Sequence, residues 1–150
     1  MTRFPLISPR PLFSLAALCA LSVSAGASAA TLSVGPGKTF SSPCKAIAVA
    51  AAGDTIEIEG SASYDGDVCV IYANNLTIRG VNGRPKINAA GQNAVGKGTW
   101  VLYGNDTTID NVEMYGAAVP DQNGAAIRLD ARGLTYKKRQ PTRPSRIART

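Results

Sequence analysis

The chain has 150 residues, with 16 Lys and Arg, 10 Asp and Glu and no His, so its formal net charge at pH 7 is +6. This length is enough for one modest domain. The lack of histidine excludes the most common general base near neutral pH and the commonest ligand of transition metals.

Residues 1–30 have the pattern of a secretory signal peptide. Arg3 and Arg10 form a positive n-region, Leu12 to Val23 is a short apolar run, and the small residues of AGASAA end the segment. The run is too short for a stable membrane anchor, although an uncleaved anchor is the alternative. We therefore expect a secreted protein, extracellular or periplasmic, with no membrane span after cleavage.

A short helix is predicted early in the mature chain. In SSPCKAIAVAAAGD, Ser42 is the expected N-cap, Pro43 the first helical residue and Gly53 the stop. The segment also contains Cys44, and the body contains one more cysteine, Cys69. An exported protein with such a pair is expected to form a disulfide, the alternative being two unpaired buried thiols.

The body is then built from short β-type runs that repeat. Three segments align: CVIYANNLTIRGV from Cys69, WVLYGNDTTIDNV from Trp100, and IRLDARGLTY from Ile127, at offsets of 31 and 27 residues. Alternate positions are apolar in each copy, and Asn, Asp and Gly mark the turns. Stacked copies of this length indicate a parallel β-helix. An antiparallel sandwich is the alternative, but no two-residue hairpin signal joins the strands.

The alignment predicts which side chains stack between coils. Thr77, Thr108 and Thr135 would form a ladder, and Asn74 would lie over Asn105 at a tight corner. The aligned inward positions are Cys69, Trp100 and Ile127, then Ile71, Leu102 and Leu129, then Ile78, Ile109 and Tyr136. Because a solenoid must cover its apolar end, the helix at Ser42 is expected to be the cap.

Several motifs together resemble a known family. VGPGKTF, AGDTIEI, NNLTIRGVNGRPKINAAG, GNDTTIDNVEMYGA and VPDQNGAAIRLDARGLT are similar to secreted bacterial right-handed parallel β-helix proteins of the pectate-lyase-like superfamily. Together with the capping helix and the repeat, the resemblance predicts an all-β, right-handed parallel β-helix over residues 31–136, with an N-terminal capping helix and about three coils. Members of this superfamily normally continue into further coils, and this sequence departs from that pattern after Tyr136, so its C-terminal end is interpreted as truncated. The resemblance also implies an acidic polysaccharide as substrate, and calcium held by carboxylates beside a basic residue.

The stacking pattern tests for such a site. Asp110 is predicted over Arg79 and Glu113 over Asn82, so no carboxylate stacks on another, and no cofactor is evident apart from the calcium that the resemblance implies. Stacked tyrosines and arginine could still bind sugars and uronates. The candidate binding residues are Tyr72, Arg79, Tyr103, Asp110, Glu113, Arg128 and Asp130. Ordinary solvated strand residues would look the same.

Residues 137–150 form a basic tail, in which six of fourteen residues are Lys or Arg. Its prolines cannot continue a strand ladder, so the tail is interpreted as a disordered extension, with a frameshift after Thr135 as one origin. A polyanion-binding arm is the alternative, and no specific nucleic-acid partner is expected.

Three functions stay open at this stage. The first is a secreted protein related to polysaccharide lyases and epimerases, which binds or acts on acidic polysaccharide in its full-length form. The second is a non-catalytic surface or binding module, and the third is a truncated product without independent activity. Whether this chain is itself an enzyme is left open, because no catalytic constellation is visible. An open C-terminal end also predicts end-to-end self-association.

Overall fold

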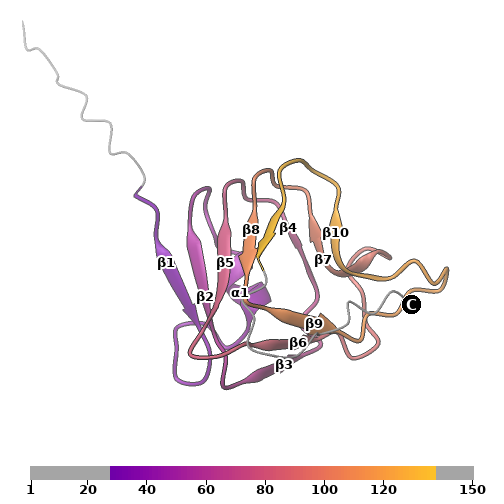
Figure 1. The fold of residues 1–150 in the computed structure, drawn as a ribbon, viewed down its shortest axis with the longest axis horizontal. Coiled ribbons are helices and arrows are strands. Elements are labelled where there is room, and N and C mark those ends of the chain that lie inside the picture. Colours follow the sequence, from indigo (N-terminus) through magenta and orange to yellow (C-terminus); the bar gives the residue numbers. More distant parts are fainter. Residues whose placement is uncertain (1–27, 138–150) are drawn as a thin grey trace, which may run out of the picture.

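Eleven short strands and one helix form in residues 28–137, which are the residues that the computed structural model describes. Apolar and polar side chains alternate along the strands because successive residues point to opposite faces of a sheet. Three sheets result, every strand pair in them is parallel, and they surround one apolar core (Figure 1). The fold is a parallel β-helix, as the repeat predicts.

The strands fall in chain order onto three sheets, here named A, B and C. Sheet A contains β1 (Thr31–Val34), β2 (Thr55–Glu59), β5 (Thr77–Val81), β8 (Thr108–Asp110) and β11 (Thr135–Lys137). Sheet B contains β3 (Ser63–Asp65), β6 (Lys86–Asn88) and β9 (Glu113–Tyr115). Sheet C contains β4 (Cys69–Ile71), β7 (Gly98–Leu102) and β10 (Ala125–Leu129). Three full coils therefore stack, with one further strand of sheet A at each end.

The strand register confirms the predicted repeat. The aligned residues lie side by side in sheets A and C, at the offsets of 31 and 27 residues: Cys69, Trp100 and Ile127; Ile78, Ile109 and Tyr136. The threonine ladder is longer than predicted and crosses all five strands of sheet A: Thr31, Thr55, Thr77, Thr108 and Thr135. The extra rungs were missed because β1 and β2 precede the first aligned copy.

One predicted stack is wrong. Glu113 pairs with Lys86 in sheet B, and not with Asn82. The prediction carried the offset of 31 residues around the whole coil, whereas β6 and β9 pair at an offset of 27. The link from sheet A to sheet B spans residues 82–85 in one coil and only 111–112 in the next, so the register changes there.

The inward side chains of the three sheets fill a single core. Those that are 0% exposed include Ile56, Ile58, Ile71, Leu76, Ile78, Ile87, Trp100, Leu102 and Ile109. Val101 is also 0% exposed, although the strand alternation assigns it to the outer face together with Tyr103. Apart from Leu129 and Tyr136 in the last coil, the other predicted inward residues belong to this core or pack against it.

The corner between sheets C and A repeats closely in every coil. Asn75, Asp106 and Gly133 adopt left-handed backbone conformations there, with φ of 56°, 56° and 71°. These are the residue types that tolerate that region. The Asn74 side chain accepts a hydrogen bond from the backbone N–H of Asn105 at 2.7 Å, which confirms the predicted Asn stack.

Helix α1 (Pro43–Ile47) follows β1 and is shorter than predicted, since it ends six residues before Gly53. Its buried residues are Pro43, Ala46 and Ile47, and the last two belong to the apolar core. Ser42 is the N-cap but its side chain makes no capping hydrogen bond. The Asp67 carboxylate takes that role, because it accepts the Cys44 backbone N–H from the neighbouring corner.

The predicted disulfide is present. Cys44 and Cys69 are bonded, with their Cα atoms 5.8 Å apart. The bond joins the helix to β4, so it ties the cap to the first full coil.

The last strands of the three sheets lie at the C-terminal end of the solenoid. Leu129 and Tyr136 are 38% and 42% exposed there, although both occupy inward positions of the repeat. Strand β11 continues to Lys137, one residue past the predicted end of the coils. The predicted signal peptide, up to residue 27, and the tail from residue 138 lie outside the described residues. Among the described residues, no helix is long and apolar enough to span a bilayer.

Candidate functional site

The seven predicted binding residues lie on three different sheets. Tyr72, Tyr103, Arg128 and Asp130 lie in or directly after the strands of sheet C; Arg79 and Asp110 lie in sheet A; Glu113 lies in sheet B. The sheets face different directions around the core (Figure 1). The candidates therefore do not form one site, and each face must be considered by itself.

Two tyrosines stack on the outside of sheet C. Tyr72 and Tyr103 each follow the last residue of a strand, β4 and β7, whose residues pair in register. Their ring centroids are 5.6 Å apart and the ring planes differ by 12°. The side chains are well exposed, at 73% for Tyr72 and 40% for Tyr103. The repeat thus builds an aromatic stack on a solvent-facing surface.

Lys97, which was not predicted, completes this surface. Its Nζ lies 5.5 Å from the centroid of the Tyr103 ring and 3.4 Å from the Tyr103 hydroxyl oxygen, and it forms an ion pair with Asp130. Arg128 Nε lies 3.7 Å from the other oxygen of Asp130. Tyr72, Lys97, Tyr103, Arg128 and Asp130 are named the tyrosine face below. Lys97 precedes β7, outside the aligned repeat, so no pattern in the sequence indicated it.

The contact between Lys97 and Asp130 stabilises the charged form of both side chains. Hydrogen bonding to Asp130, and then to the Tyr103 hydroxyl, raises the pKa of Lys97. The hydrogen bond from Lys97 lowers the pKa of Asp130, and the charges of Lys97 and Arg128 add to this effect. Both groups are therefore charged near neutral pH, and their pair carries no net charge. Arg128, whose side chain is 51% exposed, leaves the face with one net positive charge.

The rings differ in what they can still contact. One side of the Tyr103 ring faces Tyr72, and Lys97, which reaches the next coil at Asp130, lies over the ring as well. Tyr72 follows β4, the edge strand of sheet C, so its outer ring face has no tyrosine beyond it among the described residues. That open ring is a surface on which the apolar face of a sugar can pack.

Sheet A presents a row of alternating charges. Glu57, Arg79, Asp110 and Lys137 are neighbours on consecutive strands β2, β5, β8 and β11. Arg79 donates to Oε1 of Glu57 from both Nε, at 3.1 Å, and Nη2, at 2.5 Å. Glu57 was not predicted as a site residue because β2 pairs with β5 at an offset of 22 residues. The two acidic and two basic residues of this row give no net charge, and Arg79 is already paired with Glu57.

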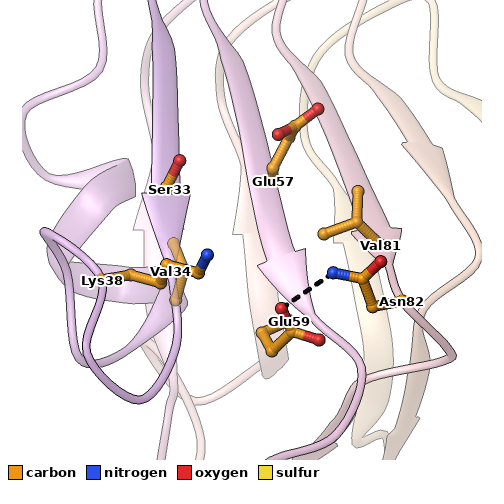
Figure 2. Close-up of a pocket in the computed structure, with 7 residues that line it drawn as sticks. All are labelled: Ser33, Val34, Lys38, Glu57, Glu59, Val81 and Asn82. Carbon is orange, nitrogen blue, oxygen red and sulfur yellow. Dashed lines mark hydrogen bonds between the residues drawn. The ribbon is translucent and has the colours of Figure 1, made fainter.

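A polar pocket of about 250 Å³ opens beside this row (Figure 2). It lies over β1, β2 and β5, near their C-terminal ends, and the segment after β1 forms one wall. The residues that line it are Ser33, Val34, Lys38, Glu57, Glu59, Val81 and Asn82. No sequence pattern marked it, since the residues come from three strands and a loop.

A hydrogen bond between two lining residues, Asn82 and Glu59, fixes one edge of the pocket. Asn82 Nδ2 donates to Glu59 Oε2 at 3.1 Å, as Figure 2 shows. The backbone of Gly35 approaches Glu59 so closely that a Cβ on Gly35 would lie 2.6 Å from the Glu59 Cβ. Glycine is therefore required for the loop that carries Lys38 to reach the pocket.

Among residues 28–137, no three His, Cys, Asp or Glu side chains are grouped so that they could hold a metal ion. Comparison with known proteins adds nothing to these observations: no protein-family model, curated protein or solved structure matches the chain.

Proposed function

We propose that this protein is a secreted β-helix protein that binds acidic polysaccharide through the tyrosine face. The observation that carries the proposal is the exposed stack of Tyr72 and Tyr103 next to Lys97 and Arg128. Aromatic rings pack against the apolar faces of sugars, and a guanidinium binds a carboxylate through two parallel hydrogen bonds. A polymer of uronic acids offers both features in each residue.

The solenoid supports binding of an extended chain. Its coils repeat at the strand spacing of about 4.8 Å, which is close to the length of one sugar residue in a stretched polymer. A polysaccharide that runs along the solenoid axis would therefore meet successive coils with successive sugars. Tyr72, Tyr103 and Asp130 follow equivalent positions of three consecutive strands, so they line such a path.

Secretion and family relationship belong to the same proposal. The Cys44–Cys69 disulfide supports an oxidising compartment, and residues 1–30 resemble a signal peptide. The quoted motifs resemble right-handed pectate-lyase-like solenoids, a superfold that hosts enzymes and binders alike. Binding, and not catalysis, is proposed because the tyrosine face offers contacts for a sugar chain and Lys97 and Asp130 are already paired.

Affinity gel electrophoresis tests the proposal. The wild-type chain should be retarded in gels that contain polygalacturonate, and Tyr72→Ala should weaken the apparent affinity about tenfold, as loss of an aromatic contact implies. Arg128→Gln should weaken binding to polygalacturonate but not to a neutral polymer such as dextran. Added salt should weaken binding to the acidic polymer, because exposed charges are screened.

A matched control is available in Tyr115. This tyrosine is also exposed, at 42%, but it lies in β9 of sheet B, away from the tyrosine face. Tyr115→Ala should bind polygalacturonate as the wild type does. The proposal is wrong if the wild type migrates equally with and without the polymer, or if Tyr72→Ala and Tyr115→Ala behave alike.

A further inference from the structure

We infer that the pocket on sheet A is a second carbohydrate site, which takes one neutral, polyhydroxylated sugar residue. The pocket is lined by Ser33, Lys38, Glu57, Glu59 and Asn82, with Val34 and Val81 beside them. It lies on a different sheet from the tyrosine face, and neither site depends on the other. The inference goes beyond the proposed function, and it can hold if that function fails.

The charges around the pocket balance, so they favour neither an anionic nor a cationic ligand. Lys38 and Arg79 carry two positive charges there, and Glu57 and Glu59 carry two negative charges. An anionic ligand would approach the two carboxylates, and a cationic ligand would approach the Lys38 ammonium. A neutral ligand avoids both penalties, so net charge favours a neutral molecule.

The hydrogen-bonding groups favour hydroxyls. Arg79 uses only Oε1 of Glu57, and Asn82 uses only Oε2 of Glu59 with its Nδ2 atom. Glu59 Oε1 accepts only a long hydrogen bond, from Ser61 Oγ at 3.5 Å. Glu57 Oε2 and the Asn82 carbonyl are further acceptors, while the Lys38 ammonium, directed toward β2, is a donor (Figure 2). A hydroxyl group both donates and accepts, so vicinal hydroxyls can use this mixed set more fully than an amine or a carboxylate can.

The size of the pocket restricts the ligand to about one sugar. Its volume is about 250 Å³, which is below the range of about 300–1,000 Å³ that is typical of sites for drug-sized ligands. Valines are the only apolar residues of the lining, and no aromatic ring is present. Affinity should therefore depend on the polar groups, and substitution of one of them should have a large effect.

The test uses ¹⁵N-labelled wild-type chain and three probes: methyl glucoside, methyl glucuronoside and methyl glucosaminide. The neutral glycoside should shift the backbone amide signals of Lys38, Glu59 and Asn82 in a saturable manner. The anionic and cationic glycosides should bind at this pocket at least about fivefold more weakly, because each meets like charge there.

A variant and its matched control separate binding from folding. Asn82 has φ of 54° and Asn75 has φ of 56°, so replacing either by Gly relaxes the same backbone conformation. Asn82→Gly removes the pocket amide and should weaken binding of methyl glucoside about tenfold. Asn75→Gly, at the corner between sheets C and A, should leave that binding unchanged.

Three results would overturn the inference. One is the absence of saturable shifts at the pocket with methyl glucoside. Another is equal binding by Asn82→Gly and the wild type, and the third is tighter binding of a charged glycoside than of the neutral one. Failure of polygalacturonate binding at Tyr72 would not affect any of these readouts, so the two proposals can fail independently.

Discussion

The Asp67 carboxylate accepts the backbone N–H of Cys44 through both oxygens, at 3.1 Å each. This contact joins the corner between sheets B and C to the first turn of helix α1. Asp67 is only 6% exposed, so its carboxyl group lies inside the capped end of the solenoid. Burial raises the pKa of Asp67, and the hydrogen bond from the Cys44 backbone N–H only partly opposes this effect.

The pH dependence of stability should follow from that shift. The folded-state pKa of Asp67 lies above 3.8, so the protonated form favours folding. Its contribution is fully present at lower pH and is lost as the pH rises from 3.8 through the raised pKa. Asp67→Asn, which cannot ionise, should therefore lose this decline. The measurement is the difference in urea unfolding free energy between wild type and Asp67→Asn as a function of pH.

Asp54 provides a control, because its pKa is shifted in the opposite direction to that of Asp67. Its carboxylate accepts the N–H groups of Ala30 and Ala51 at 2.8 Å each, and these hydrogen bonds lower its pKa below 3.8. The stability that Asp54 contributes is present above 3.8 and is lost as the pH falls through the lowered value. If Asp54→Asn and Asp67→Asn changed the pH profile in the same direction, the assignment of Asp67 would be contradicted.

The disulfide should account for much of the stability of the capped end. Cys44 and Cys69 are 25 residues apart in sequence, and closing a loop of that length stabilises the folded state by about 3 kcal/mol from chain entropy. The double variant with Ser at both positions should lose that amount in urea unfolding. Reducing agent should destabilise the wild type by a similar amount and leave the double variant unaffected. An equal response of both proteins to reductant would show that the disulfide is not the cause.

Thr107 should be replaceable with a gain in stability. It occupies an inward position equivalent to Leu76 and is 1% exposed, and its hydroxyl has no hydrogen-bond partner among residues 28–137. Thr107→Val removes the buried hydroxyl at nearly constant shape, so the free energy of unfolding should rise by about 1 kcal/mol. Thr108→Val, on the outward ladder, should change it by less than about 0.5 kcal/mol. A loss of stability in Thr107→Val would indicate that the hydroxyl is satisfied.

Gly104 should tolerate no side chain. A Cβ at this position would lie 2.0 Å from the backbone oxygen of Ala73 in the coil before. Gly104→Ala should therefore destabilise the fold by at least about 2 kcal/mol, since a backbone atom cannot move aside. Gly96 is the control: its φ is 70° but its Cβ would meet nothing within 4 Å, so Gly96→Ala should cost only about 1 kcal/mol. Equal thermal melting of both variants would contradict the steric argument.

The sequence predicted the parts of the fold that depend on periodicity. Strand alternation placed Ile78, Ile109 and Tyr136 in one row, because each coil must present the same face to the core. The corner residues Asn75 and Asp106 were predictable because few residue types adopt their backbone conformation. Glu113 was misplaced because the offset between coils changes at the corner between sheets A and B, where no pattern fixes the length.

The surfaces were predicted less well than the core. Tyr72 and Tyr103 were found because they occupy equivalent positions of the repeat. Lys97 and Lys38 were missed because each lies in a loop whose path depends on tertiary contacts, such as the approach of Gly35 to Glu59. Sequence periodicity assigns the row of a side chain, but not which loop residue reaches that row.

The constant corner between sheets C and A also bears on how such a chain can be lengthened. Its links are residues 72–76, 103–107 and 130–134, whereas the links from sheet B to sheet C range from residues 66–68 to 89–97 and 116–124. The corner between sheets B and C therefore accepts links of different length while the rows of residues on sheet A stay in register. A peptide tag or a foreign binding loop inserted within residues 89–97 should leave the scaffold intact, while the same insertion at Asn74 would break the stack through every later coil.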